Sequence, residues 1–145
     1  LRSSCFCGMV FRLEKFSMKK NIVFLAIGDL LAIAILTFIG FATHGEADIS
    51  FLPRMSAAFF PVLVGWFLLA PWFGLFDEQV ISSLKSLWRI LPAMLAVAPL
   101  AVILRAAILN SAALPIFTLV LGSTNAFGML IWRAIYLFVI QRNVH

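Results

Sequence analysis

The segment "FLAIGDLLAIAILTF", residues 24–38, is almost entirely apolar and carries one charged side chain, Asp29. It belongs to an apolar run over residues 21–43, and about 20 helical residues cross the ~30 Å core of a bilayer. A carboxylate inside such a span is costly to expose to lipid. The segment therefore predicts a membrane-spanning helix in which Asp29 faces protein or trapped water.

The composition of the whole chain indicates the same class of protein. Hydrophobic residues make up 63% of its 145 residues, charged residues make up 12%, and the mean hydropathy is +1.08. Such a chain has too little polar surface to coat a soluble globule, and its apolar stretches lack the polar faces of soluble helices. Because long alternating strands are also absent, helices must satisfy the backbone in the membrane. The sequence predicts a single all-α integral membrane domain.

Four transmembrane helices are expected, forming a bundle over about residues 21–43, 57–76, 85–109 and 115–140. The second span is drawn through Pro71 and ends just before the polar segment "DEQ" at residues 77–79. The fourth span would be about 39 Å long, so it should tilt or project from the membrane.

Lysine and arginine residues are unevenly distributed between the two ends of these spans. The side that holds both termini has Arg2, Arg12, Lys15, Lys19, Lys20, Lys85, Arg89, Arg133 and Arg142, whereas the other side has only Arg54 and Arg105. The positive-inside rule then places both termini in the cytoplasm, with the protein in the plasma or inner membrane. The net charge of +5 is interpreted as a topology signal. No nucleic-acid partner is expected, because binding one requires a basic soluble face.

The first seventeen residues, "LRSSCFCGMVFRLEKFS", mix charges and small residues without a clear period. The following "MKKNIVFLAIG", from Met18, resembles a natural start of translation ahead of an apolar run. That run is too long for the apolar region of a signal peptide and lacks a clean cleavage site. The pair Cys5 and Cys7 does not complete a four-ligand zinc set. Residues 1–17 are interpreted as an upstream or disordered extension, and residues 18–145 as the membrane domain.

Depth within the membrane selects a partner for Asp29. At 1.5 Å per residue, Asp29 lies about 12 Å below the cytoplasmic edge, while Arg133, 18 residues after Pro115, lies near that edge. Arg105 lies farther away, toward the outer side. We expect a polar network in which an ionised Asp29 pairs with Arg133, or bonds to Asn125, and holds the first and fourth spans together. A proton-carrying Asp29 is the alternative.

Helices approach closely in membranes where their contact faces carry small residues. One face of the fourth span holds Thr118, Gly122 and Asn125 within about 60°, which predicts a close-packing seam or, alternatively, a site for a polar ligand. Five glycines are expected at helix-packing contacts: Gly28, Gly40, Gly65, Gly122 and Gly128.

Seven short stretches follow one another along the spans. They are "GD" at residues 28–29, "THG" at 43–45, "PVLVGW" at 61–66, "APWFG" at 70–74, "ILR" at 103–105, "PIF" at 115–117 and "IWR" at 131–133. Their order resembles that of the small prokaryotic membrane proteins grouped as domain of unknown function 3054. The resemblance covers about residues 20–133. It implies a multi-pass membrane protein and brings no established activity with it.

Signatures of catalysis are missing from the sequence, which has no H-E-x-x-H, no G-x-S-x-G and no phosphate-binding glycine loop. His44 lies near Glu46 and Asp48 and could contribute to a metal site, but a loop histidine without that role is the simpler interpretation. We therefore expect no catalytic residue, no metal and no cofactor.

Three classes of function fit these observations. The leading one is a non-enzymatic accessory or structural subunit that packs against a membrane-protein partner or a second copy of itself. A small oligomeric carrier or proton-coupled transporter that uses Asp29 is the first alternative. A membrane enzyme acting on lipid or quinone is the second. The lipid bilayer is the partner that the composition itself implies.

Overall fold

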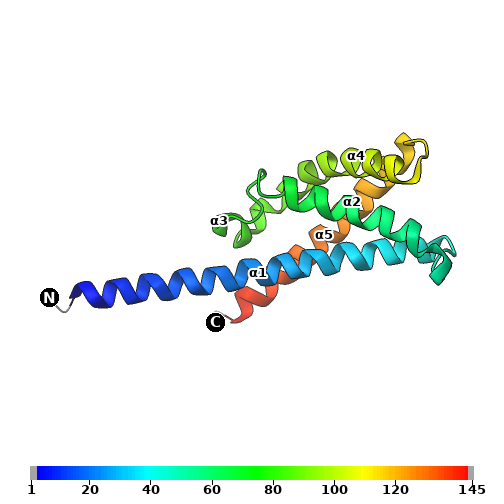
Figure 1. Cartoon of the computed structure of the whole chain (residues 1–145). Coiled ribbons are helices and arrows are strands. Elements are labelled where there is room, and N and C mark those ends of the chain that lie inside the picture. Colours follow the sequence, from blue (N-terminus) through cyan, green and yellow to red (C-terminus); the bar gives the residue numbers. More distant parts are fainter. Residues whose placement is uncertain (1–2, 144–145) are drawn as a thin grey trace.

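The computed structural model describes the backbone of residues 3–143 and the side chains of residues 20–139 and 142. Every regular element in that part of the chain is helical. The long helices are α1 (Ser3–Thr43), α2 (Leu52–Leu69), α4 (Ile90–Leu109) and α5 (Pro115–Asn143), as Figure 1 shows. Shorter elements lie in the connections: η1 (Ile49–Phe51), α3 (Glu78–Ile81) and η2 (Leu84–Arg89).

Four helical segments in the described part of the chain are long and apolar enough to cross a membrane. They are Lys20–Thr43, Ile49–Leu69, Leu84–Leu109 and Pro115–Val139. The prediction of an all-α protein with four membrane-spanning helices is confirmed at this level of length and composition. The prediction about residues 1–17 lies outside the described side chains and stays a prediction.

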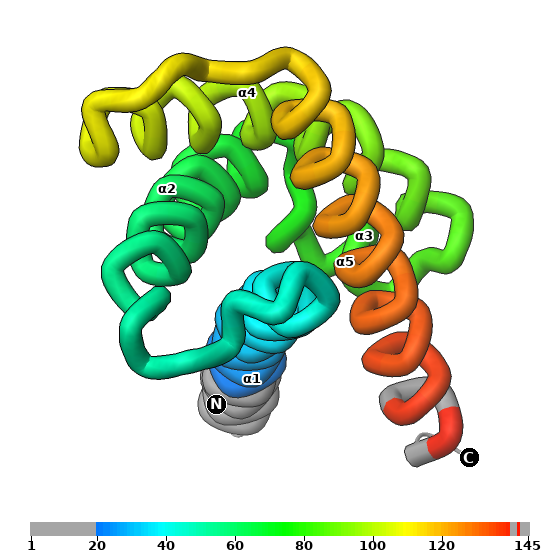
Figure 2. The backbone as a smooth tube through the Cα atoms, turned by 90° about the vertical axis from the view of Figure 1, so that its right-hand side faces the viewer, coloured from blue at the N-terminus to red at the C-terminus, as the bar shows by residue number. Residues whose placement is uncertain are grey.

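The four long helices pack as a ring in which each helix lies mainly against two others. α1 contacts α2 and α5, and α4 contacts the same two helices from the opposite side. Figure 2 looks along α1 and shows α2 to its left, α5 to its right and α4 above. The ring places the first and the last helix side by side, so residues about a hundred positions apart in the sequence can meet.

The second helix differs from its predicted bounds of residues 57–76. It begins at Leu52, directly after η1, and it ends at Leu69. Pro53 lies in the first turn of α2, where the missing N–H and the fixed φ of proline are compatible with a helix start. The helix therefore begins earlier than its apolar run suggested.

The end of α2 was also predicted too late, because Pro71 was placed inside the span. Proline supplies no N–H for the next intrahelical hydrogen bond and commonly follows the last turn of a helix, although Pro61 is accommodated inside α2. Residues 70–76 form a turn instead, in which Gly74 has φ = 66°. This left-handed conformation favours glycine. The turn reverses the chain so that Leu75 is buried in the hydrophobic core of the bundle.

The core lies largely between α2 and α4. Ala93, Val97 and Ala101 repeat every four residues along α4 and are buried, so they form one face of that helix. Trp66 of α2 is fully buried in the same hydrophobic cluster. A Cβ at Gly65 would lie only 3.1 Å from Val97, so the glycine permits a close approach. This packing fixes the position of the Trp66 indole.

The outer surface along the spans is apolar. Large side chains such as Phe24, Leu95, Phe127 and Phe138 are more than half exposed, at 61%, 70%, 67% and 71%. In water an apolar surface of this extent would drive association, whereas lipid acyl chains cover it in a membrane. The chain is therefore a multi-pass membrane protein whose helices contact the bilayer.

Replacing Gly122 with Ala will lower the melting temperature of the purified protein in detergent. A Cβ at Gly122 would lie 2.9 Å from the Cβ of Ala98 on α4, and neither methyl group can rotate away. The helices must separate slightly, at a cost of about 1–3 kcal/mol. Gly40→Ala is the matched control, because among the described residues no neighbouring atom lies within 4 Å of its Cβ position. Equal melting temperatures for the two variants would contradict close packing at Gly122.

Candidate functional site

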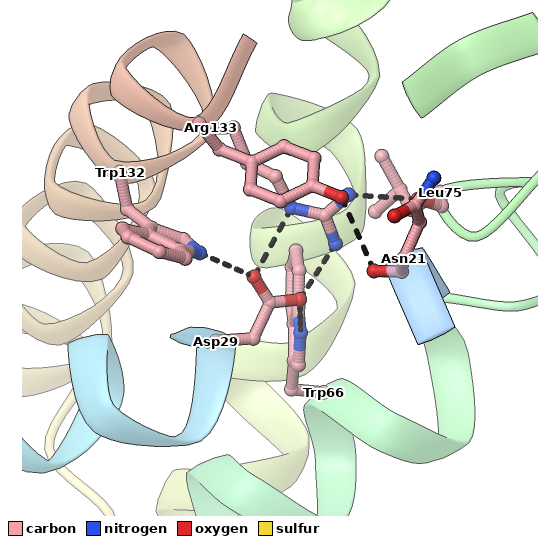
Figure 3. Close-up of polar contacts among 7 residues, drawn as sticks. Asn21, Asp29, Trp66, Leu75, Trp132 and Arg133 are labelled. Atoms are coloured by element: carbon pink, nitrogen blue, oxygen red, sulfur yellow. Dashed lines mark hydrogen bonds and ion pairs between the residues drawn. The ribbon is translucent and has the colours of Figure 1, made fainter. Parts of the chain in front are cut away.

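Asp29 lies inside the α1 span and is completely buried, with an exposed fraction of 0%. Three side chains converge on its carboxylate, as Figure 3 shows: Trp66 from α2, and Trp132 and Arg133 from α5. Asp29 is the only acidic residue within the four candidate spans. It contacts protein on all sides and is removed from lipid.

The guanidinium of Arg133 binds this carboxylate at two points. Its Nε donates to Oδ1 of Asp29 at 3.1 Å, and its Nη2 donates to Oδ2 at 2.6 Å. Its Nη1 donates to the backbone carbonyl of Leu75 at 2.8 Å, and the Phe76 ring centre lies 5.3 Å from the guanidinium carbon. Arg133 is 4% exposed. Two-point pairing of this kind is among the strongest hydrogen-bonding arrangements in proteins.

Two tryptophan side chains complete the surroundings of Asp29. The indole N–H of Trp132 donates to Oδ1 and that of Trp66 donates to Oδ2, each at 3.0 Å. Each carboxylate oxygen therefore accepts two hydrogen bonds, and an ionised carboxylate offers about four acceptor positions in all. The acceptor capacity of Asp29 is fully used. We call Asp29, Trp66, Trp132, Arg133 and the Leu75 carbonyl the Asp29 network.

Two glycines allow the network to form. A Cβ on Gly28 would overlap the Trp132 ring, so the absence of a side chain lets the indole approach α1. Gly74 gives the turn after α2 its left-handed residue, and this turn delivers the Leu75 carbonyl to Arg133. The network thus depends on backbone positions as well as on charged side chains.

Tyr136, one turn after Trp132, adds a further contact between α5 and α1. Its hydroxyl donates to the backbone carbonyl of Asn21 at 3.1 Å. Its ring lies 6.0 Å from that of Phe24 and 6.1 Å from that of Trp132, measured between ring centres. The polar network is therefore continued by aromatic packing along the same helix pair.

The structure brings together two of the four polar residues singled out in the sequence. Asp29 and Arg133 form the ion pair, whereas Asn125 and Arg105 lie elsewhere in the bundle. The Nδ2 of Asn125 donates at 2.9 Å to a carbonyl one turn earlier on its own helix, so the alternative bond from Asn125 to Asp29 is not formed. The Arg105 guanidinium lies 4.6 Å from the centre of the Phe117 ring.

Four of the five glycines expected at packing contacts lie against a neighbouring helix, and one does not. A Cβ would come within 3.1 Å of a neighbouring helix at Gly28, Gly65, Gly122 and Gly128. The expectation for Gly40 is wrong, because α1 borders a cavity at that level and no neighbouring atom of the described residues lies within 4 Å of a Cβ there.

Sequence reasoning did not assign Trp66, Trp132 or Leu75 to this site. One signal was available for the tryptophans, because an indole N–H inside a span needs an acceptor and Asp29 is the only acid there. The Leu75 carbonyl had no such signal, since its position depends on the turn that ends α2.

Comparison with known families extends over most of this structure. The family described as "Protein of unknown function (DUF3054)" matches residues 26–136, a range that contains the whole Asp29 network. The chain belongs to this family. The resemblance noted in the sequence is confirmed. No curated protein and no solved structure matches the chain.

The Asp29 network of this DUF3054 protein offers few groups that could bind a substrate or a metal ion. With four donors on two oxygens, the Asp29 carboxylate offers no unoccupied acceptor to a substrate. In the described part of the chain, no three His, Cys, Asp or Glu side chains gather closely enough to hold a metal ion. What the geometry provides is a link that joins α1, α2, α5 and the turn after α2.

Proposed function

We propose that this protein is a non-enzymatic accessory or structural subunit of a prokaryotic cell membrane, with its bundle held in one arrangement by the Asp29 network. The observation that supports this most is the saturation of the carboxylate by four donors. A residue that carries a proton or activates a substrate must exchange hydrogen-bond partners during its cycle. Asp29 has no position at which to do so while the network is closed.

Protonation of Asp29 would conflict with every neighbouring group. A neutral carboxyl contains an O–H donor, but its neighbours here are themselves donors, namely the Arg133 guanidinium and the indoles of Trp66 and Trp132. At least one hydrogen bond would be lost, and Arg133 would remain charged and buried without its anion. These costs favour an ionised, structural Asp29 over a proton-carrying one.

The proposal includes an orientation, with both termini in the cytoplasm and the protein in the plasma or inner membrane. It rests on the excess of lysine and arginine on the side that holds the termini. In this orientation the Asp29 network lies in the cytoplasmic half of the bundle, because Trp66 lies in the last turn of α2 and Leu75 in the turn that follows.

Proton flux in proteoliposomes tests the structural role. Under an imposed pH gradient and membrane potential, liposomes that contain the wild-type protein should acidify no faster than protein-free liposomes. Asp29→Asn should leave that rate unchanged and lower the melting temperature, because it disrupts the hydrogen bonds of the network. Asp48→Asn, at an exposed loop position, should change neither quantity. A wild-type proton flux that Asp29→Asn abolishes, in protein that still folds, would overturn the proposal and favour a proton-coupled carrier.

A further inference from the structure

A cavity of about 150 Å³ lies in the half of the bundle opposite the Asp29 network. Side chains of α1, α2, α4 and α5 line it, together with His44 and Glu46 from the loop after α1. This loop begins where the first span ends at Thr43, so one end of the cavity lies at the depth of the lipid headgroups. The other end reaches Asn125, about 15 Å along α5 from Pro115.

Two residues that line this cavity carry buried polar atoms without a hydrogen-bond partner. Within the described residues, these unpartnered atoms are Oδ1 of Asn125 and Nε of Arg105. Asn125 is 4% exposed, and its amide nitrogen already donates to its own helix, which identifies the oxygen as the unused acceptor. An unpaired buried polar group destabilises the folded protein, because it has lost its hydrogen bonds to water and gained none in return. A ligand that offers a donor to Asn125 and an acceptor to Arg105 would remove both costs.

The charges around the cavity favour an anion. Glu46, in the cavity wall, pairs with Arg54 at 3.4 Å. Arg105 lies against the Phe117 ring, and no acidic group of the described residues lies within ion-pair distance of it. Arg54 lies outside the cavity wall and offsets the charge of Glu46, so Arg105 is the charged group of the wall that has no ion-pair partner among the described residues. The guanidinium of Arg105 is therefore the group to which an anionic ligand would bind.

The size of the cavity limits what enters it. A cavity of ~150 Å³ holds a guest about as large as benzene, which is far smaller than a whole lipid. Leu36, Phe41, Val120 and Leu121 make part of the wall apolar. The glycerol group of a lipid headgroup is about as large as benzene and matches this volume while the phosphate and the acyl chains lie farther out, and the glycerol group of a free glycerol phosphate matches it equally well.

We propose that this cavity binds a hydroxylated phosphate anion of the glycerophosphate class. A phosphate oxygen accepts from the guanidinium of Arg105, and a glycerol hydroxyl donates to Oδ1 of Asn125 once this occluded amide turns toward the cavity. The same chemistry occurs in the headgroup of phosphatidylglycerol and in free glycerol phosphate. The proposal is independent of the role of Asp29, because the cavity and the Asp29 network share no residue.

Lipid binding to the purified protein in detergent, followed by thermal shift and native mass spectrometry, tests this assignment. Phosphatidylglycerol should bind more tightly than phosphatidylcholine with the same acyl chains. Phosphatidylmethanol, which keeps the anion but lacks the hydroxyl groups, should bind about fivefold less tightly than phosphatidylglycerol, as expected for one lost hydrogen bond. Arg105→Gln should weaken phosphatidylglycerol binding about tenfold or more, because it removes a charge-assisted bond.

The variant Asn125→Ala distinguishes the contribution of the ligand's hydroxyl groups from that of its negative charge. Asn125→Ala should abolish the preference for phosphatidylglycerol over phosphatidylmethanol and keep the preference over phosphatidylcholine. Lys85→Gln removes the same charge from an exposed position at the opposite end of the bundle and should leave binding unchanged. If Asn125→Ala does not fold, the comparison of Arg105→Gln with Lys85→Gln decides.

Competition identifies the source of the ligand. Soluble glycerol phosphate that displaces phosphatidylglycerol would support the site and show that it accepts the free anion. Failure of glycerol phosphate to compete, with the lipid preferences intact, would support a lipid headgroup site. Equal binding of phosphatidylglycerol and phosphatidylcholine by the wild type, or unchanged binding by Arg105→Gln, would overturn the proposal.

Discussion

Arg133→Gln will lower the free energy of unfolding by about 3–5 kcal/mol, the range for breaking a buried ion pair from one side. The substitution leaves the fully buried Asp29 carboxylate with only its two indole donors. It also removes the Nη1 donor that lies 2.8 Å from the Leu75 carbonyl. Unfolding by sodium dodecyl sulfate in mixed micelles, followed by tryptophan fluorescence, measures this loss.

A double-mutant cycle separates the ion pair from the other contacts of Arg133. Asp29→Asn alone is destabilising, because its new NH₂ group faces the donors of the network. The combination Asp29→Asn with Arg133→Gln contains no buried charge at this site, so its cost should fall short of the sum of the single costs by at least about 1 kcal/mol. Arg142→Gln, at an exposed position on the same helix, should change stability by less than about 0.5 kcal/mol. Strictly additive effects of the two network substitutions would contradict direct pairing.

The meeting of Asp29 with Arg133 shows how far helix geometry carries a prediction. One acid within the spans, a rise of about 1.5 Å per residue and antiparallel neighbours place the two residues within reach of each other. The same geometry left Asn125 open as a partner, about 12 Å away from Arg133 along α5. The choice between them depends on the relative shift of α1 and α5, which periodicity does not define. Side-chain packing sets that shift, with Tyr136 and the Asn21 carbonyl among its contacts.

Other parts of the site depend on tertiary structure from the start. Trp66 reaches Asp29 because the packing of α2 on α4 sets the orientation of α2 about its own axis. Hydropathy does not define that orientation. The end of α2 was predicted too late because the apolar run continues past Pro71. Gly40 was expected in a packing contact, but a small residue in a span does not determine whether another helix or a cavity lies opposite it. The apolar pattern of a sequence indicates which residues share a helix face, and tertiary packing determines what lies against that face.

Gly28→Ala will destabilise the bundle by about 2–4 kcal/mol, although it adds a single methyl group to a helix. A Cβ at this position would overlap the six-membered ring of the Trp132 indole, which must then move away from α1. The displacement adds an overpacking cost to the loss of the Trp132 hydrogen bond to Oδ1 of Asp29. Thermal unfolding in detergent measures the cost.

The background variant Trp132→Phe tests whether this collision is the cause. Phenylalanine lacks the distal ring of the indole, so it removes both the overlapping atoms and the N–H donor. Trp132→Phe alone should cost about 1–3 kcal/mol, because Asp29 loses one donor while it stays buried. Gly28→Ala added to that background should cost much less than in the wild type, since space has opened beside α1 and no Trp132 hydrogen bond remains to be lost. If Gly28→Ala lowers stability equally in the wild type and in Trp132→Phe, contact with the Trp132 ring is not the cause. A reduced cost would show that the glycine before Asp29 gives Trp132 the room it needs to donate to the carboxylate.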